Sequence, residues 1–243
     1  MNLACPQSGF KKTLRKMADL CLAPRAFARS LHIGPRLKLA YVNNPKVACS
    51  TIKLALGRAE LENPDWTPQG SVHDHTCSPL VTFPEQTGQE RAALTGHFVF
   101  SFVRCPFARL RSVYLNKIIT GRNAGRPRQM AGFTADHCPS FEEFVLAVCA
   151  QPPARQNPHW RLQAAGLSMS AIRYDFIGRL EHFDADWAWL AARFDLPQLP
   201  ERRGRRTNAA HRQDLEFSAR MRDAVHSGYA ADFALFGYTG KSG

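Results

Sequence analysis

The sequence predicts an α/β fold whose central, mostly parallel sheet is flanked by helices. Short apolar runs rich in β-formers alternate along the chain with segments of helical periodicity. One run, residues 97–104 (HFVFSFVR), is almost continuously apolar, which is typical of a central strand covered on both faces. Because such sheets bind ligands at the carboxyl ends of their strands, we expect the functional residues there.

The first half of the chain contains two strand-loop-helix units. Residues 38–44 (KLAYVNN) predict a strand, and residues 45–61 (PKVACSTIKLALGRAEL) predict a loop that enters a helix. Residues 62–90 are rich in Pro and Thr and predict a long irregular excursion, a kind of loop that is usually functional. After the strand at 97–104, Pro106 starts a second helix at a position where its missing N–H does no harm.

The second half continues the alternation. Ser140 and Glu143 form a capping box at the start of a further helix. The remaining predicted elements are a basic loop at 120–139, a strand at 171–180, a helix at 184–194, a very basic loop at 197–213 and a final helix from about residue 214 to 227 that leads into YAADFALFGY.

Composition narrows the class of protein. The chain has 243 residues, 44% of them hydrophobic, which excludes global disorder, and a net charge of +12, which favours an anionic partner. Its seven cysteines form no C-x-x-C pair, which argues against a zinc ribbon or a dense disulfide framework. No apolar run near the N-terminus has the length of a signal peptide or a membrane span, so we expect a cytoplasmic protein.

Residues 1–35 are interpreted as a basic, helical N-terminal extension and residues 36–243 as a single domain. Apolar side chains recur at helical spacing between residues 10 and 21, with lysines and an arginine between them. This helix either docks on the domain with a solvated basic face or makes peripheral contact with an anionic membrane.

Residues 41–53 (YVNNPKVACSTIK) have the features of a phosphate cradle. A strand delivers Lys46 to the start of a helix, where free N–H groups and the hydroxyls of Ser50 and Thr51 face the same space. The segment lacks the G-x-x-x-x-G-K-[ST] pattern of ATP-binding loops. Taken alone, it also fits an ordinary capped helix.

A second candidate lies at residues 100–114 (FSFVRCPFARLRSVY). Arg104 ends the predicted central strand, and Ser112 lies a little over two turns into the next helix, on a face that can return toward the strand end. A guanidinium fork with a hydroxyl suits a phosphate monoester. Alternatively, Arg104 caps the strand and Ser112 is simply exposed.

Together these segments resemble the two nucleotide loops of the sulfotransferases that use 3′-phosphoadenosine-5′-phosphosulfate (PAPS), above all the chondroitin, dermatan and uronyl 2-O enzymes. Those families show P-K-x-A-[CS]-[ST] before a helix and F-x-F-V-R-x-P-x-x-R-L-x-S-x-Y in the second loop. NPHWRLQ at 157–163, YDFIGRLEHFDADWAWL at 174–190 and the ending YAADFALFGY are similar to further family elements. The resemblance covers about residues 38–239 and implies a P-loop-like, three-layer sulfotransferase domain.

The resemblance also implies roles for individual residues. Lys46 would hold the 5′-phosphosulfate and offset charge on the leaving oxygen, while Arg104 and Ser112 would bind the 3′-phosphate; no metal would be required. The other residues implied in donor binding are Ala48, Cys49, Ser50, Thr51, Arg205, Arg206 and Thr207.

The general base is expected in the sequence VHDHTCSPL, because related enzymes carry histidines in this interval. We take His75 first and His73 second. A metal site built from these histidines and Cys77 lacks a clear fourth ligand. The residues considered on the acceptor side are His97, His159 and Trp160. His97 fits a partly buried, hydrogen-bonded structural histidine better, and the pair His159 and Trp160 fits a packing feature equally well. Glu181 is interpreted as a structural partner of a nearby arginine.

The chain departs from lumenal relatives in lacking a cysteine pair after the H-W element, where it reads RLQAAGLSMS. We therefore expect a bacterial-type cytosolic enzyme that sulfates a hydroxyl of a saccharide or glycolipid, with PAP as the second product and no nucleic-acid partner. The acceptor's identity and the oligomeric state stay open. Two alternatives remain: a nucleotide kinase-like phosphoryl transferase, which lacks a clear glycine-rich loop, and a non-catalytic binder of anionic glycan or nucleic acid.

Overall fold

One mixed five-stranded sheet organises the protein. The computed structural model describes residues 27–83, 92–121, 124–199 and 215–239. The strands follow the spatial order β3-β1-β2-β4-β5, with β2, β4 and β5 parallel and β1 antiparallel to both β2 and β3. The strands are β1 (Leu31–Gly34), β2 (Leu39–Val42), β3 (Val81–Thr82), β4 (Phe98–Val103) and β5 (Phe176–Arg179).

The α/β class is confirmed and β4 is an interior strand, paired with β2 and β5, but the sheet is less parallel than predicted. The connection from β1 to β2 is only four residues long, and so short a link permits antiparallel pairing alone. All four residues of β1 are buried in the sheet. The predicted domain boundary at residue 36 is therefore too late, because residues 31–34 form a strand of the same sheet.

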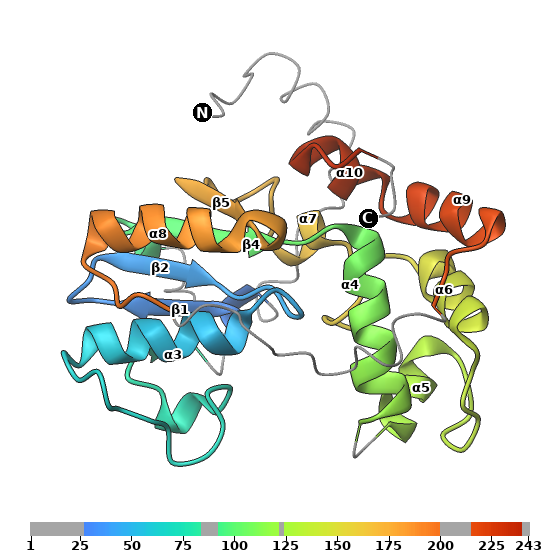
Figure 1. Cartoon of the computed structure of the whole chain (residues 1–243), viewed down its shortest axis with the longest axis horizontal. Helices are drawn as coiled ribbons and strands as arrows, with labels where there is room; N and C mark the ends of the chain where they lie inside the picture. The colour runs from blue at the N-terminus through green and yellow to red at the C-terminus, as the bar shows by residue number, and fades with distance from the viewer. Residues whose placement is uncertain (1–26, 84–91, 122–123, 200–214, 240–243) are drawn as a thin grey trace.

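Helices surround the sheet and gather beyond the carboxyl ends of β2 and β4 (Figure 1). No helix in the described part of the chain is long and apolar enough to cross a membrane. The helices and helical turns are α3 (Cys49–Glu60), η1 (His75–Cys77), η2 (Ala92–Leu94), α4 (Pro106–Val113), the π-helical turn η3 (Tyr114–Ile119), α5 (Gly125–Ala131), α6 (Phe141–Ala150), α7 (Gln163–Gly166), η4 (Leu180–His182), α8 (Phe183–Phe194), α9 (Ala219–Gly228) and α10 (Ala230–Phe236).

Local signals in the sequence place several helix starts correctly. Pro106 occupies the first turn of α4 as predicted. Ser140 caps α6, and the Glu143 carboxylate accepts from the Ser140 N–H at 2.7 Å, which completes the predicted capping box. The predicted N-terminal helix and most of the basic loop at 197–213 lie outside the described residues.

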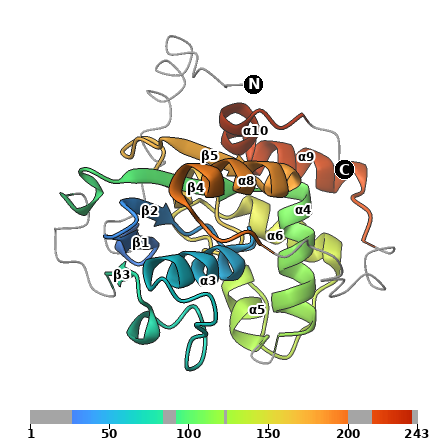
Figure 2. The same cartoon turned by 60° about the vertical axis from the view of Figure 1, so that its left-hand side comes forward.

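One face of the sheet is covered by α3 and α8, whose buried side chains belong to one hydrophobic cluster; Figure 2 shows the two helices over different parts of the sheet. Leu39 and Tyr41 of β2 and Phe100 and Phe102 of β4 point to this face. The apolar stripe of α3 recurs with a spacing of three and four residues, and each fully buried Leu or Ile in such a stripe contributes about 2 kcal/mol. Its buried members are Ile52, Ala55, Leu56 and Ala59. The first turn of α3 is thereby held at the carboxyl end of β2.

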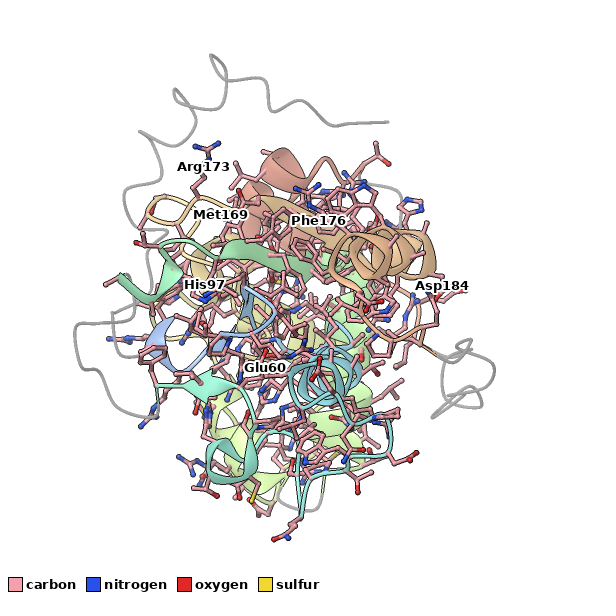
Figure 3. The ribbon with its side chains drawn as sticks, turned by 90° about the vertical axis from the view of Figure 1, so that its left-hand side faces the viewer. Glu60, His97, Met169, Arg173, Phe176 and Asp184 are labelled. Carbon is pink, nitrogen blue, oxygen red and sulfur yellow. The ribbon has the colours of Figure 1, made fainter. Side chains whose placement is uncertain are left out.

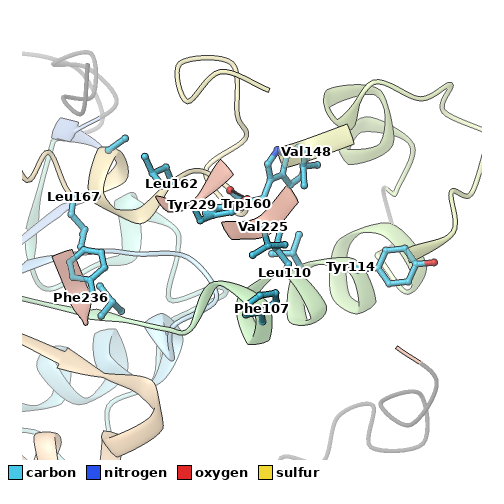
Figure 4. Packing of buried hydrophobic residues seen from close by; sticks show 14 of the residues in the cluster. Phe107, Leu110, Tyr114, Val148, Trp160, Leu162, Leu167, Val225, Tyr229 and Phe236 are labelled. Atoms are coloured by element: carbon cyan, nitrogen blue, oxygen red, sulfur yellow. Dashed lines mark hydrogen bonds between the residues drawn. The ribbon is translucent and has the colours of Figure 1, made fainter. Parts of the chain in front are cut away.

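The larger core lies between the opposite face and the helices α4, α6, α9 and α10. Figure 4 shows Trp160 and Tyr229 side by side within it. The Tyr229 hydroxyl donates to the Trp160 carbonyl oxygen at 2.5 Å, and both side chains are fully or almost fully buried. This contact fixes the 157–163 loop against the C-terminal helices.

A buried polar network joins the strand ends to the last helix. The amide of Gln163 accepts from the Arg104 N–H at 3.0 Å, donates to the Arg104 carbonyl at 2.8 Å, and accepts from Asn44 Nδ2 at 2.9 Å. The carboxylate of Asp232 accepts from the backbone N–H groups of Gln163 and Ala164 at 2.9 and 2.8 Å. Burial raises the pKa of Asp232 to about 6, although the N–H donors and Arg109 oppose this.

Replacing Asp232 by Asn is expected to lower the free energy of unfolding by about 2 kcal/mol, because an amide presents only one oxygen and its NH₂ then faces one of two buried N–H groups. Urea denaturation at pH 7.5 measures the change. Asp223→Asn, on the exposed side of α9, is the matched control and should change the midpoint little. Equal midpoints for the two variants would contradict this account of the network.

Candidate functional site

The loop between β2 and α3 presents free backbone donors at the carboxyl edge of the sheet. Lys46 and Ala48 have φ angles of 71° and 53°, in the left-handed region that side chains rarely adopt. Ala48 occupies the N-cap without a side-chain cap, and the first turn of α3 carries no acidic residue. The N–H groups that begin the helix, with Ser50 and Thr51 beside them, are therefore suited to an anion.

The two loops singled out in the sequence meet at this edge. A guanidinium nitrogen of Arg104 lies 3.4 Å from the Lys46 carbonyl oxygen, which accepts its hydrogen bond. The Lys46 ammonium donates to Asn116 Oδ1 at 2.9 Å. Burial, followed by the charges of Lys117 and Arg104, lowers the pKa of Lys46 to about 8. Ser112 lies half-buried on the second turn of α4.

Arg109 holds two loops of the candidate site together. Its buried guanidinium donates to the carbonyl oxygens of Pro45, Pro158 and Arg161 at 3.1, 3.0 and 2.6 Å. It also donates to Asn44 Oδ1 at 3.4 Å. A buried arginine satisfied by carbonyl groups ties the β2–α3 loop to the 157–163 loop, so both loops keep one position relative to the strand ends.

The two histidines of the excursion have different surroundings. His73 Nε2 lies 2.9 Å from Ser50 Oγ, and its Nδ1 lies 3.4 Å from Lys53 Nζ. His75 stacks on the buried His32 with ring centroids 5.6 Å apart, and its Nδ1 is buried without a hydrogen-bond partner in the described part of the chain. His73, the second choice as base, is therefore the one in contact with the start of α3.

Desolvation and neighbouring cations favour the neutral form of both rings. Burial, then Lys53, Lys117 and His75, lowers the pKa of His73 to about 4. Burial and Lys53 also lower the pKa of His75. A neutral imidazole has a lone pair for a proton, and one next to the start of α3 lies close to the predicted anion.

The three residues considered on the acceptor side lie in different parts of the structure. His97 precedes β4 at the amino end of the sheet, the side seen in Figure 3, about 20 Å along the strand from Arg104. His159 lies near the charged side chains of Lys117, Lys46 and Arg109. Burial, followed by these charges, lowers the pKa of His159 to about 3. Trp160 is fully buried and packs in the core, so the structure bears out the packing alternative and not the acceptor-side role.

Glu181 has structural hydrogen bonds, as predicted, but its partners are not the arginine that was expected. Its carboxylate accepts from the Cys105 N–H at 2.8 Å and from the Tyr238 hydroxyl at 3.1 Å. Arg179 instead stacks over the Tyr238 ring at 5.1 Å. The carboxyl ends of β4 and β5 are thereby linked to the end of the described chain.

Sequence reasoning missed three residues that the structure brings to the site. Asn116 and Lys117 belong to the π-helical turn after α4, where the wider winding changes which side chains face Lys46. Lys53 lies on α3, three residues after Ser50, and is only 6% exposed. Its spacing from Ser50 was a usable signal because residues three apart share a helix face.

Some predictions fall outside the described residues, namely those for Arg205, Arg206 and Thr207. For the metal alternative, the described residues hold no group of three His, Cys, Asp or Glu side chains arranged to bind a metal ion. The alternative built on His73, His75 and Cys77 is therefore unsupported.

Comparisons with known proteins give one consistent result. The model of the sulfotransferase family matches residues 29–239. Carbohydrate sulfotransferase 14 of Danio rerio is 31% identical over an alignment covering 89% of this chain and 64% of that protein. The human carbohydrate sulfotransferase 14 is 28% identical, covering 88% and 61%, and Xenopus laevis carbohydrate sulfotransferase 12 is 28% identical, covering 95% and 64%.

The chain spans less than two thirds of the length of these relatives. No solved structure shows significant similarity to it.

The charge of Lys46 makes anion binding depend on pH. Because the ammonium form is lost as the pH rises through about 8, we expect the affinity for inorganic pyrophosphate to fall between pH 7 and pH 9. Isothermal titration calorimetry at the two pH values measures the change. Lys46→Arg keeps its charge at both and should flatten the dependence; an unchanged slope in this variant would assign the titration to another group.

Proposed function

Since the chain belongs to the sulfotransferase family, we propose that it transfers a sulfuryl group from PAPS to a hydroxyl of a carbohydrate or glycolipid. One observation carries the proposal: the Arg104 guanidinium meets the Lys46 carbonyl, so two cation-bearing loops adjoin the uncapped start of α3. A donor with phosphates at both its 5′ and 3′ positions needs two such loops. The family also supports a P-loop-like description of the α/β domain.

The residues at the edge of the sheet suit this donor. Lys46, with the N–H groups and hydroxyls at the start of α3, is proposed to bind the 5′-phosphosulfate, and Arg104 with Ser112 the 3′-phosphate. The helix start has no acidic side chain to repel an anion, and Lys46 and Arg104 repel each other until one arrives. From the resemblance, we keep Arg205, Arg206 and Thr207 as proposed donor contacts.

The transfer itself is proposed to be an in-line displacement. The acceptor oxygen attacks sulfur as its proton leaves, and the S–O bond to the 5′-phosphate breaks. Lys46 then offsets the charge on the departing phosphate. We propose His73 as the base in place of His75, because its Nε2 lies 2.9 Å from Ser50 Oγ while His75 stacks against His32.

The acceptor class rests on the relatives, which are named carbohydrate sulfotransferases. The cluster of cations at the site favours an acceptor whose anionic groups are drawn to it. We also keep as proposals a cytoplasmic location and membrane contact through the basic N-terminal segment, both from the sequence features described above.

Adenosine 3′,5′-bisphosphate should bind more tightly than AMP, because only the first carries the 3′-phosphate assigned to Arg104. Lys46→Ala and Arg104→Ala should each weaken its binding by about 10- to 100-fold, the loss of one charge-assisted hydrogen bond. Calorimetry at pH 7 measures both. Arg173→Ala, on an exposed arginine away from the site (Figure 3), is the control. Equal affinity for the two nucleotides would exclude the proposed donor.

The choice of base predicts unequal effects for the two histidines. His73→Asn should lower kcat by 10²- to 10⁴-fold, the usual range for loss of a general base, whereas His75→Asn should lower it by less than about tenfold. Sulfate transfer from PAPS to acceptors in a glycan extract, followed by mass spectrometry, gives the rates. The reverse order of effects would return the role to His75.

A further inference from the structure

Lys53 is a buried amine that the proposed mechanism does not use. It lies on α3 beneath His73, is 6% exposed, and its Nζ is 3.4 Å from His73 Nδ1. A buried ammonium is costly unless it is paired, and burial lowers the pKa of Lys53 to about 8, with Cys49 opposing the change. Near neutral pH this side chain can therefore exist as an ammonium or as a neutral amine.

His73 is held at both ring nitrogens, Nε2 by Ser50 and Nδ1 by Lys53. A neutral imidazole carries one N–H and one lone pair. An ammonium can only donate, so a charged Lys53 requires the lone pair on Nδ1 and leaves the proton on Nε2. A neutral amine can accept the Nδ1 proton, which leaves the lone pair on Nε2.

Building on the proposed function, we propose that Lys53 is a positioning residue whose protonation state selects the tautomer of His73. Only the neutral amine leaves Nε2 free to take a proton from the acceptor hydroxyl. In that step the acceptor O–H bond breaks, an Nε2–H bond forms, and the Nδ1 proton passes to Lys53 Nζ. The imidazole ends neutral, Lys53 ends as an ammonium, and the acceptor oxygen carries the electron pair to sulfur.

The proton is held better on the amine than on the ring. The pKa of His73 is lowered to about 4, so the imidazolium form of His73 loses its proton readily. The pKa of Lys53 is about 8, so the amine binds the proton more strongly. The described titratable groups that face either residue are His32 on β1, Cys49 on α3, His75 on η1, Lys117 on the π-helical turn and His159 before α7. They include no carboxylate, and of these groups Cys49 alone favours the ammonium form of Lys53.

The pH dependence of kcat tests the proposal, with saturating donor so that its phosphates keep Lys46 charged. The wild type should lose about tenfold in kcat per pH unit below pH 8. Lys53→Met removes the amine, and its acidic limb should move toward the histidine range. Lys53→Arg is always charged and should be at least tenfold slower than Lys53→Met at pH 9.

The exposed Lys38→Met is the matched control and should keep the wild-type profile. An acidic limb in Lys53→Met identical to that of the wild type, or full activity of Lys53→Arg at pH 9, would overturn the proposal. If Lys53→Met does not fold by circular dichroism, Lys53→Gln takes its place.

A second readout needs no turnover. Two-bond ¹H–¹⁵N spectra report which ring nitrogen carries the proton, and His73→Asn assigns the signal. The tautomer should change as the pH passes about 8 in the wild type and stay constant in Lys53→Met. A constant tautomer in the wild type would reject the role of Lys53 and leave the proposed function intact, whereas a fully active His73→Asn would reject His73 as the base.

Discussion

The pairing of the Gln163 side chain with the backbone of Arg104 is the contact on which the rest of the site depends. One amide satisfies both the N–H and the carbonyl of Arg104 where the central strand ends, and it also accepts from Asn44 at the end of β2. Its own backbone is held by Asp232 of α10. Because these groups are buried, each unpaired donor or acceptor would cost about 1–3 kcal/mol, so the two loops of the candidate site keep one geometry.

The second constraint is electrostatic. Lys46, Lys53, Arg104 and Lys117 converge on one edge of the sheet, and the pKa values of Lys46 and Lys53 are both lowered to about 8. The ion pair between Arg36 and Glu62 lies near the other end of α3 and does not offset them. An arriving polyanion relieves this repulsion, so part of the binding energy for such a ligand is already present in the free protein. Part of the net charge of +12 is thus concentrated at this edge of the sheet.

Local patterns in the sequence were sufficient for much of the fold. The continuous apolar run identified the central strand, and Pro106 and the Ser140–Glu143 capping box located helix starts. These succeeded because each depends on neighbouring residues alone. The antiparallel strand β1 was missed, since four residues carry too short a pattern to be read without their partner. For Trp160 the sequence left an acceptor-side role and a packing role open, because its burial depends on contacts with Tyr229 and Phe144 that no neighbouring residue encodes.

The sequence by itself determined the family, the two cation-bearing loops and the interval in which the base is proposed, because these are carried by short motifs of contiguous residues. Only the tertiary structure decided that His73 rather than His75 contacts Ser50. The contacts of Asn116 with Lys46 and of Lys53 with His73 were likewise decided by the tertiary structure alone. Those contacts join an irregular excursion, a helix and a π-helical turn, and their relative positions follow from packing across the sheet. No local spacing encodes a distance of that kind.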